Sequence, residues 1–263
     1  MKRNLSLLLI LFFFIPSLAC GSLTTNSVTG SGNIITKTID VGKFDRVTLE
    51  GFGDIYITQG QSESLSVQTD DNIIPLLEMQ VRGSELRLGM KQGMDVNPTQ
   101  SITYQLTVSE LNNVTLAGSG NFYLEPVKSG DLTVSIPGSG NIDIKGLNAG
   151  KLSIDLGGSG NITIENINAK TVDASIKGSG DIKLGGNANT QNMTIDGSGN
   201  YLAGSLETDI ADISVPGSAD VTVWVNDELK IKVNGSGHIQ YYGKPTVDQN
   251  VSGSGNITSL GKK

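Results

Sequence analysis

The sequence is poor in the residue types on which most cross-links and reactive sites depend. Its 263 residues include one cysteine, one histidine and seven prolines, and only 5% are aromatic. A single cysteine excludes a disulfide within the chain, and a single histidine excludes a site built on several imidazoles. Charged residues make up only 17%, yet Val, Ile and Leu are frequent, so the composition is not that of a disordered chain.

Basic residues are also few, and this limits the partners. The formal net charge is -7, and loss of residues 1–19, which hold Lys2 and Arg3 and no acidic residue, makes it -7 - 2 = -9. A chain this acidic is repelled by phosphate backbones, which excludes nucleic acid as a partner. The one long apolar run, Leu7 to Ile15, is too short to span a bilayer comfortably.

The N-terminal segment, from Met1 to Cys20, has the pattern of an export signal. A positive start, the short apolar run and Pro16 to Cys20 predict a signal peptide over residues 1–19. The pattern resembles a bacterial lipoprotein signal, in which Cys20 carries the lipid: Ala19 fits, although Ser17 and Leu18 depart from the usual residues. The alternative is an ordinary cleaved signal with a chance cysteine nearby. The expectation is an exported chain, lipid-anchored in the envelope, with the outer membrane or cell surface preferred.

Residues 20–38, rich in Ser, Thr, Gly and Asn, are predicted to be the lipidated cysteine and a flexible tether. A Gly-Ser-Gly-Asn-Ile segment at Gly30 leaves open an early rung of the domain that follows.

The dominant feature is a recurring Gly-Ser-Gly-Asn tetrapeptide, usually followed by isoleucine. It opens at Gly30, Gly118, Gly138, Gly158, Gly197 and Gly253, with variants at Gly51, Gly178, Gly217 and Gly235. From Gly118 onward these opening glycines follow one another at nearly constant intervals. A fixed period of about 20 residues is typical of stacked repeats.

Apolar residues alternate with polar ones on both sides of each tetrapeptide, which is the signature of strands. Leu152, Ile154 and Leu156 precede Gly158, and Ile162 and Ile164 follow it. Two such strands cannot bury an inner face alone, so stacking in parallel is expected. The glycines would serve sharp corners, by positive φ or by close backbone approach. The predicted fold is all-β, a parallel β-helix of about eight to ten coils.

The prediction for the domain is a single β-helix over residues 39–260. Residues 118–260 form the regular repeats, and residues 60–117 form an irregular capping insert, because the interval from Gly51 to Gly118 corresponds to about three coils without the motif. Within the insert, Asp71 to Met79 could form a short helix, and Met90 to Gln100 is predicted to be a loop.

The repeats, together with the opening Phe44 to Gly60 and the segment Leu65 to Asn72, resemble the bacterial family "putative auto-transporter adhesin, head GIN domain". The resemblance covers roughly residues 39–257. It implies a right-handed parallel β-helix at the cell surface or in the envelope, and it brings no catalytic motif.

The fourth position of each repeat is predicted to form a ladder of stacked side chains along the rod. We call these residues the corner ladder: Asn121, Asn141, Asn161, Asp181, Asn200, Asp220, His238 and Asn256. A calcium site on this ladder is disfavoured, because most positions are neutral amides and Asp181 and Asp220 would lie about 10 Å apart. His238 is interpreted as a tolerated corner residue rather than a base or metal ligand, so no metal or cofactor is expected.

Two further groups are candidate sites. Outward carboxylates could serve a polysaccharide-degrading enzyme, but they are scattered over the coils: Asp143, Asp155, Glu165 and Asp173. Trp224 is expected to point outward, where it could stack on a sugar or anchor a partner.

The protein is therefore predicted to be a non-enzymatic envelope lipoprotein, an adhesin or surface-display β-helix. It would make multivalent polar contacts and be held to the membrane by its lipid. The possible partners are a surface glycan or an envelope or matrix protein. The alternatives are a carbohydrate-binding or polysaccharide-active β-helix, and a purely structural role. The sequence leaves the oligomeric state open.

Overall fold

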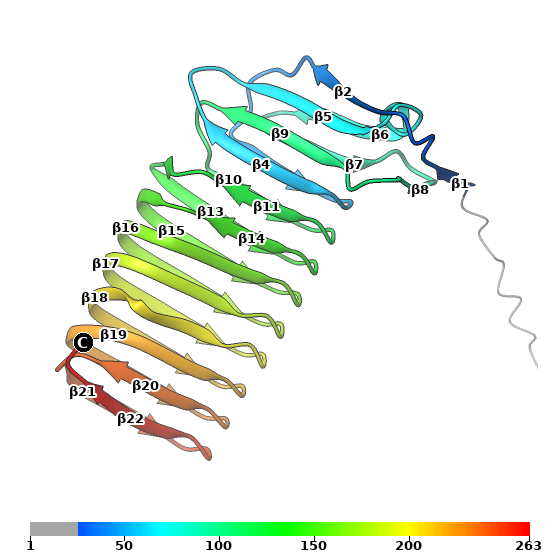
Figure 1. Ribbon diagram of the computed structural model, residues 1–263. Helices are drawn as coiled ribbons and strands as arrows, with labels where there is room; N and C mark the ends of the chain where they lie inside the picture. The colour runs from blue at the N-terminus through cyan, green and yellow to red at the C-terminus, as the bar shows by residue number, and fades with distance from the viewer. Residues whose placement is uncertain (1–25) are drawn as a thin grey trace, which may run out of the picture.

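The computed structural model describes residues 26–263, which form a long β-solenoid closed at one end by a cap (Figure 1). The predicted all-β class and parallel stacking are confirmed: about 65% of the described residues are in strands, and the stacked coils make about seven turns. The only helical segment among the described residues is the single 3-10 turn η1 (Ile74–Leu76). Residues 26–263 contain no helix long and apolar enough to span a membrane.

Two groups of strands build the molecule. The cap holds β1 (Asn26–Thr29), β2 (Ile34–Ile39), β3 (Arg46–Leu49), β4 (Asp54–Gln59), β5 (Ser64–Asp70), β6 (Leu77–Arg82), β7 (Glu85–Met90), β8 (Met94–Asn97) and β9 (Thr103–Val108). The coils that follow hold β10 (Asn113–Leu116), β11 (Asn121–Leu124), β12 (Val127–Lys128), β13 (Asp131–Ile136), β14 (Asn141–Ile144), β15 (Leu147–Leu156), β16 (Asn161–Ile176), β17 (Ile182–Ile195), β18 (Tyr201–Val215), β19 (Asp220–Val233), β20 (His238–Tyr242), β21 (Thr246–Val251) and β22 (Asn256–Gly261).

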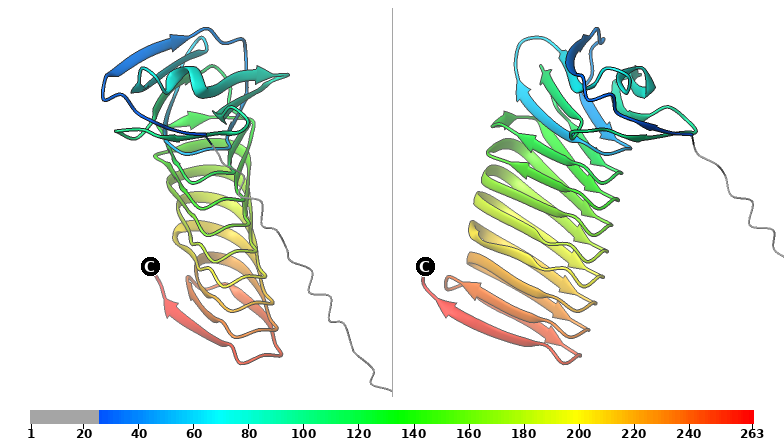
Figure 2. Two further views of the ribbon diagram at one scale, coloured as in Figure 1. Left: turned by 90° about the vertical axis from the view of Figure 1, so that its right-hand side faces the viewer. Right: turned by 45° about the vertical axis from the view of Figure 1, so that its right-hand side comes forward.

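The coils stack in register because each repeats the same pattern of corners and alternating side chains. Ile142 pairs with Ile162, and Ile162 with Ile182, one coil at a time. The inward positions predicted from the alternation are buried, among them Leu152, Ile154 and Leu156. Figure 2 shows these coils stacked one on another along the rod. Parallel pairing thus turns a short apolar pattern, insufficient in one coil, into continuous columns of side chains.

One part of this interior is polar. Gln191 is fully buried in a column that has Val172 in the coil before and Ala211 in the coil after. The Tyr201 hydroxyl donates to Gln191 Oε1 at 3.1 Å, and Gln191 Nε2 donates to Thr208 Oγ1 at 2.7 Å. The buried amide is therefore satisfied on both sides.

The cap departs from the sequence order of the coils. β3 and β4 form one coil, and the chain then places β7 and β9 on one side of it and β10 and β11 on the other. Gly51 and Gly118 are consequently neighbours in the stack, although they are far apart along the chain. Three coils were expected from the length of chain between Gly51 and Gly118. The structure has one coil there, formed by β7 and β9, together with antiparallel strands. This is why the solenoid has fewer turns than expected.

Antiparallel strands finish the cap. β5 pairs with β9, β2 pairs with β5, and β6 pairs with β7, all antiparallel, so that the two main sheets continue past the last parallel coil. The possible helix at residues 71–79 is only the turn η1, followed by β6. The predicted loop at residues 90–100 contains β8, which pairs in parallel with β1.

Residues 26–38 differ from the predicted flexible tether, because they form β1 and β2. The first Gly-Ser-Gly-Asn is neither tether nor coil corner: it connects these strands and wraps the buried carboxylate of Asp70. Gly32 N donates to Asp70 Oδ1 at 2.7 Å, and Thr99 N donates to Asp70 Oδ2 at 2.8 Å. A Cβ on Gly30 would lie 2.4 Å from this carboxyl group. Signal peptide and Cys20 lie outside the described residues.

The opposite end of the rod is less apolar. In the last coil, Gln249 pairs with Ile231 and Ser259 pairs with Tyr241, so polar side chains take inward positions. Both are exposed. This end is therefore polar and exposed, and no extra strands of the described residues cover it.

Candidate binding surfaces

The corner ladder is a chain of hydrogen bonds that runs along one edge of the rod. Asn141 Nδ2 donates to Asn121 Oδ1 at 3.0 Å, and Asn161 Nδ2 donates to Asn141 Oδ1 at 3.1 Å. The backbone N–H groups of these residues donate to the same oxygens. Each side-chain carbonyl thus holds the next coil at two points, which fixes the height of every corner.

The aspartate side chains of the ladder accept hydrogen bonds but cannot donate them. The ladder begins at Asp54, whose Oδ1 accepts from Asn121 Nδ2 at 2.8 Å. At Asp181, Oδ1 accepts from Asn200 N and Nδ2, both at 2.9 Å, while Asp181 N donates to Asn161 Oδ1. Asp220 N closes the series by donating to Asn200 Oδ1 at 3.1 Å.

The ladder stops after Asp220. His238 is exposed, and its backbone N–H donates to Ala219 O at 3.2 Å instead of to a side chain. Asn256 donates to Thr258 within its own coil. The described residues contain no group of three or more His, Cys, Asp and Glu side chains that could hold a metal ion.

Close backbone approach explains the corner glycines. A Cβ on Gly158 would lie 1.7 Å from Gly138 O, and a Cβ on Gly160 would lie 1.7 Å from Gly140 O. Neither Gly158 nor Gly160 has positive φ. Of the two reasons weighed from the sequence, the contact between coils therefore applies here.

Trp224 is half-buried on the outer surface, as the alternation predicted, but its ring has an intramolecular partner. The Lys263 ammonium lies 5.0 Å from the Trp224 ring centroid and 5.3 Å from that of Tyr242. The same ammonium donates to Gly204 O. Such a cation–π contact ties the C-terminus to the coils and occupies the ring that was the candidate for ligand contact.

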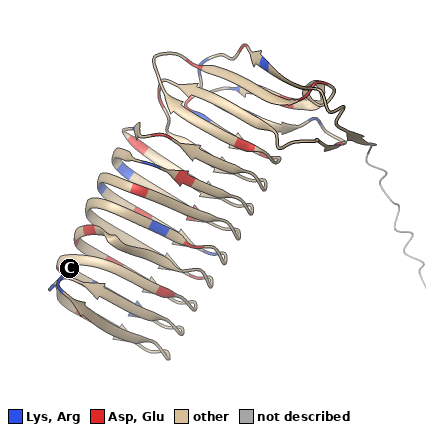
Figure 3. Ribbon diagram, viewed as in Figure 1, with Lys and Arg blue, Asp and Glu red and all other residues tan. Residues whose placement is uncertain are grey.

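Three of the four candidate carboxylates, Asp155, Glu165 and Asp173, have basic partners in neighbouring coils. Lys145 Nζ lies 2.6 Å from Glu165, Lys151 Nζ lies 2.6 Å from Asp173, and Lys177 Nζ lies 3.4 Å from Asp155. The hydrogen bond that Lys145 Nζ donates to Glu165 raises the pKa of Lys145. Figure 3 shows the charges scattered over the coils. These pairs serve the stacking of the coils, each worth about 0–1 kcal/mol.

A further surface feature, a pair of stacked tyrosines, was missed from the sequence. The Tyr56 and Tyr123 rings lie 5.0 Å apart between centroids with an interplanar angle of 20°. Tyr56 is 46% exposed. Burial is the first cause that raises the pKa of Tyr123, followed by the charges of Asp54 and Asp143. The signal was present: each tyrosine stands two residues after the fourth position of its repeat, in Gly51-Phe-Gly-Asp-Ile-Tyr and Gly118-Ser-Gly-Asn-Phe-Tyr.

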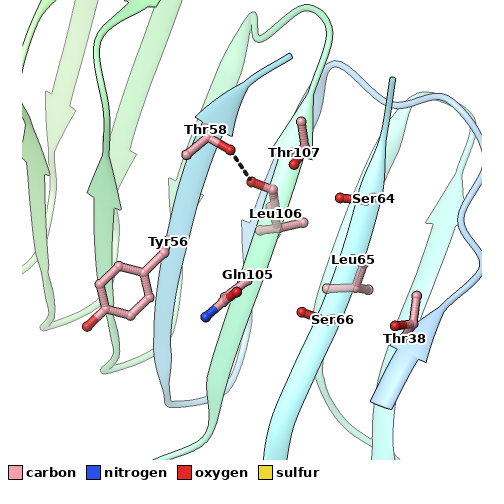
Figure 4. A pocket seen from close by; sticks show the side chains of 9 residues that line it. All are labelled: Thr38, Tyr56, Thr58, Ser64, Leu65, Ser66, Gln105, Leu106 and Thr107. Carbon is pink, nitrogen blue, oxygen red and sulfur yellow. Dashed lines mark hydrogen bonds between the residues drawn. The ribbon is translucent and has the colours of Figure 1, made fainter. Parts of the chain in front are cut away.

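Beside this pair lies a surface hollow of about 360 Å³ on the outer face of β4, β9, β5 and β2 (Figure 4). Tyr56 stands at one side of it and Thr38 at the other. Between them lie the side chains of Gln105 and Ser66. This arrangement offers one aromatic face and several uncharged donors and acceptors, which suits recognition of a polar, uncharged ligand.

Comparisons with known proteins agree with the architecture. The sequence matches the model of the family described as "Putative auto-transporter adhesin, head GIN domain" over residues 43–165 and 134–245. A crystal structure from Parabacteroides merdae, named a "putative adhesin", is 26% identical with a TM-score of 0.84 and covers 89% of this chain and 99% of its own. One from Parabacteroides distasonis, named a "putative lipid binding protein", is 28% identical with a TM-score of 0.82 and the same coverage.

No curated protein matches the sequence. The family match spans most of the described residues, including the cap coil formed by β3 and β4 and the regular repeats. The chain belongs to the head GIN domain family of auto-transporter adhesin-like proteins.

Proposed function

We propose that this protein is an exported, lipid-anchored display protein, whose rod makes many weak polar contacts with a glycan, an envelope protein or a matrix component. The observation that carries this proposal is the repetition itself. Outward polar side chains recur at each coil, at the strand spacing of about 4.8 Å. A repeated surface favours multivalent binding, in which individually weak contacts add up.

The position of the cap supports anchoring through the N-terminus. Asn26, the first described residue, belongs to the cap, six residues after Cys20. A lipid on Cys20 would place the cap next to the membrane and direct the regular coils away from it. A single acyl chain binds membranes only marginally, whereas several chains on one cysteine anchor stably.

A non-catalytic role is favoured by the chemistry of the surface. The carboxylates Asp155, Glu165 and Asp173 form ion pairs with lysines, which leaves them poorly suited to act as an acid and base couple. The interior of the coils is filled by buried side chains such as Ile142 and Ile162. Contact through the outer surface is therefore favoured over uptake of a ligand into the core.

The test is to express the full chain and its Cys20→Ala variant in a bacterial host and to compare membrane fractionation and adherence of cells to matrix- and glycan-coated surfaces. The expected result is loss of the chain from the membrane fraction in the variant, with loss of adherence. Adherence that is equal with the full chain, with Cys20→Ala and with an empty vector would refute the contact role. Retention of the variant in the membrane would refute the lipid anchor.

A further inference from the structure

We infer that the hollow beside Tyr56 binds a neutral polysaccharide chain, with the Tyr56 ring as its stacking wall and Tyr123 as the residue that positions that ring. This inference rests on the proposed contact role and names the class of partner. It goes beyond the Trp224 candidate, because Lys263 already lies over that ring.

A straight row of outward side chains crosses this region of the sheet. Cross-strand pairing aligns Thr38 with Ser66, Ser66 with Gln105, Gln105 with Tyr56, and Tyr56 with Tyr123. Four strand spacings separate the two ends, which corresponds to roughly 19 Å. The hollow takes up three of these spacings, from Thr38 to Tyr56, or roughly 14 Å, and this length suits several units of an extended chain better than one small molecule.

The aromatic pair gives the row a rigid wall. Tyr123 stacks on one face of the Tyr56 ring, and Tyr56 remains 46% exposed at the edge of the hollow that it lines (Figure 4). An exposed single tyrosine would sample several rotamers, whereas a stacked pair holds its geometry and gains about 0.5–1.5 kcal/mol beyond area burial. A sugar ring presents apolar C–H groups on its face, and these pack on an aromatic ring while its hydroxyls remain free for hydrogen bonds.

The remaining lining matches those hydroxyls. Two of the lining residues, Leu65 and Leu106, have buried apolar side chains. Apart from these and the tyrosine, the lining side chains are hydroxyls and one amide: Thr38, Thr58, Ser64, Ser66, Gln105 and Thr107. Within the described part of the chain, Thr58 alone of these six makes a side-chain hydrogen bond, to Leu106 O at 3.3 Å. The others can each donate and accept, as sugar hydroxyls can.

Charge decides between neutral and ionic polymers. The lining side chains carry no charge. Burial raises the pKa of Tyr123, and the charges of Asp54 and Asp143 raise it further, so these carboxylates lie near that end of the row. The chain is acidic overall, with a formal net charge of -7. A polyanion would be repelled with no compensating cation in the hollow, so a neutral chain is the occupant that fits.

The experiment measures retention of the purified exported chain on a panel of polymers: the neutral polysaccharides cellulose, starch, xylan and chitin, and the anionic alginate. The expected result is binding to at least one neutral polymer and not to alginate. Tyr56→Ala should weaken that binding at least tenfold, and Tyr123→Ala about threefold or more, because Tyr56 then loses its support. Tyr123→Phe, which keeps the stack, should bind within about twofold of the parent.

Trp224→Ala is the matched control, since it removes an outer aromatic ring far along the rod and should leave retention unchanged. Circular dichroism of every variant confirms that the coils remain folded. Absence of retention on all four neutral polymers, equal binding by Tyr56→Ala, or preference for alginate would each overturn the inference. The adherence test of the proposed function can be repeated with cells that express the Tyr56→Ala variant. If these cells adhere as well as cells that express the parent chain, the contact role stands and only the glycan site is lost.

Discussion

Substitution of one corner glycine tests the reason for the repeat. In Gly158→Ala the new Cβ would lie 1.7 Å from Gly138 O, whereas real Cβ contacts are not shorter than 3.0 Å. The two coils must therefore move apart locally by roughly the difference between these distances. That movement would break the hydrogen bonds from Gly158 N to Ile136 O, now 2.9 Å, and from Ser159 N to Gly138 O, now 3.1 Å. Two such bonds contribute about 1 kcal/mol each and overpacking costs about 1–3 kcal/mol, so we expect a loss of about 3–5 kcal/mol.

The neighbouring glycine provides the control. A Cβ on Gly157 would lie 3.8 Å from Pro137 Cα, an ordinary contact, so Gly157→Ala should leave the stability unchanged or raise it by up to about 1 kcal/mol. Thermal unfolding followed by far-ultraviolet circular dichroism should place Gly158→Ala about 6–20 °C below the parent. Equal melting temperatures for Gly157→Ala and Gly158→Ala would refute the close-approach argument.

Three further predictions concern polar groups. Tyr201→Phe removes the donor to the buried Gln191 and should lower the free energy of unfolding by about 1–3 kcal/mol. Tyr104→Phe removes a buried hydroxyl that has no hydrogen-bond partner, so it should be neutral or stabilising by up to about 1 kcal/mol. Denaturant unfolding compares the two variants, and equal losses of stability would contradict the assignment. Asn161→Asp removes the Nδ2 donor to Asn141 in the preceding rung and adds a like charge one coil from Asp181, so its free energy of unfolding should fall by about 1–3 kcal/mol. Asn256→Asp, beyond the end of the ladder, should change the free energy of unfolding by less than about 0.5 kcal/mol, and the reverse order would argue against the ladder. Desolvation raises the pKa of Asp70, but hydrogen bonds from Thr99 and Gly32 outweigh it and lower the pKa below 3.8. The stabilisation by this carboxylate is therefore complete above pH 3.8 and is lost as the pH falls through the pKa of the folded state. Asp70→Asn should flatten the dependence of melting temperature on pH in that acid range, and an unchanged slope would count against this prediction.

The sequence was sufficient for the coils because period and alternation reinforce each other there. At Ile142 or Ile162 a residue's direction follows from its place relative to the glycine, and parallel pairing at the next repeat is the only way to bury it. Gln191 breaks that pattern, since this polar residue at an inward position is satisfied only by Tyr201 and Thr208, which both lie in the next coil.

The cap could not be predicted in the same way, because its pairing does not follow chain order. Nothing in the spacing shows that Asn113 has both Arg46 and Thr133 as neighbours. The tyrosine pair depends on the same step, since Tyr56 meets Tyr123 only once β4 and β11 are adjacent. Knowledge that Gly51 and Gly118 are stacked would have been enough to find it.

The order of the strands in the cap also has a consequence for how the chain assembles. Every strand that closes that end precedes Asn113, so the closing end can be finished before any regular turn is made. Each later turn then finds a ready template on one side only, and addition proceeds in a single direction as the polypeptide emerges. A chain interrupted at any later point would still leave a shorter rod with the same sealed base, and its length could change in evolution by duplication of single turns without redesign of the start.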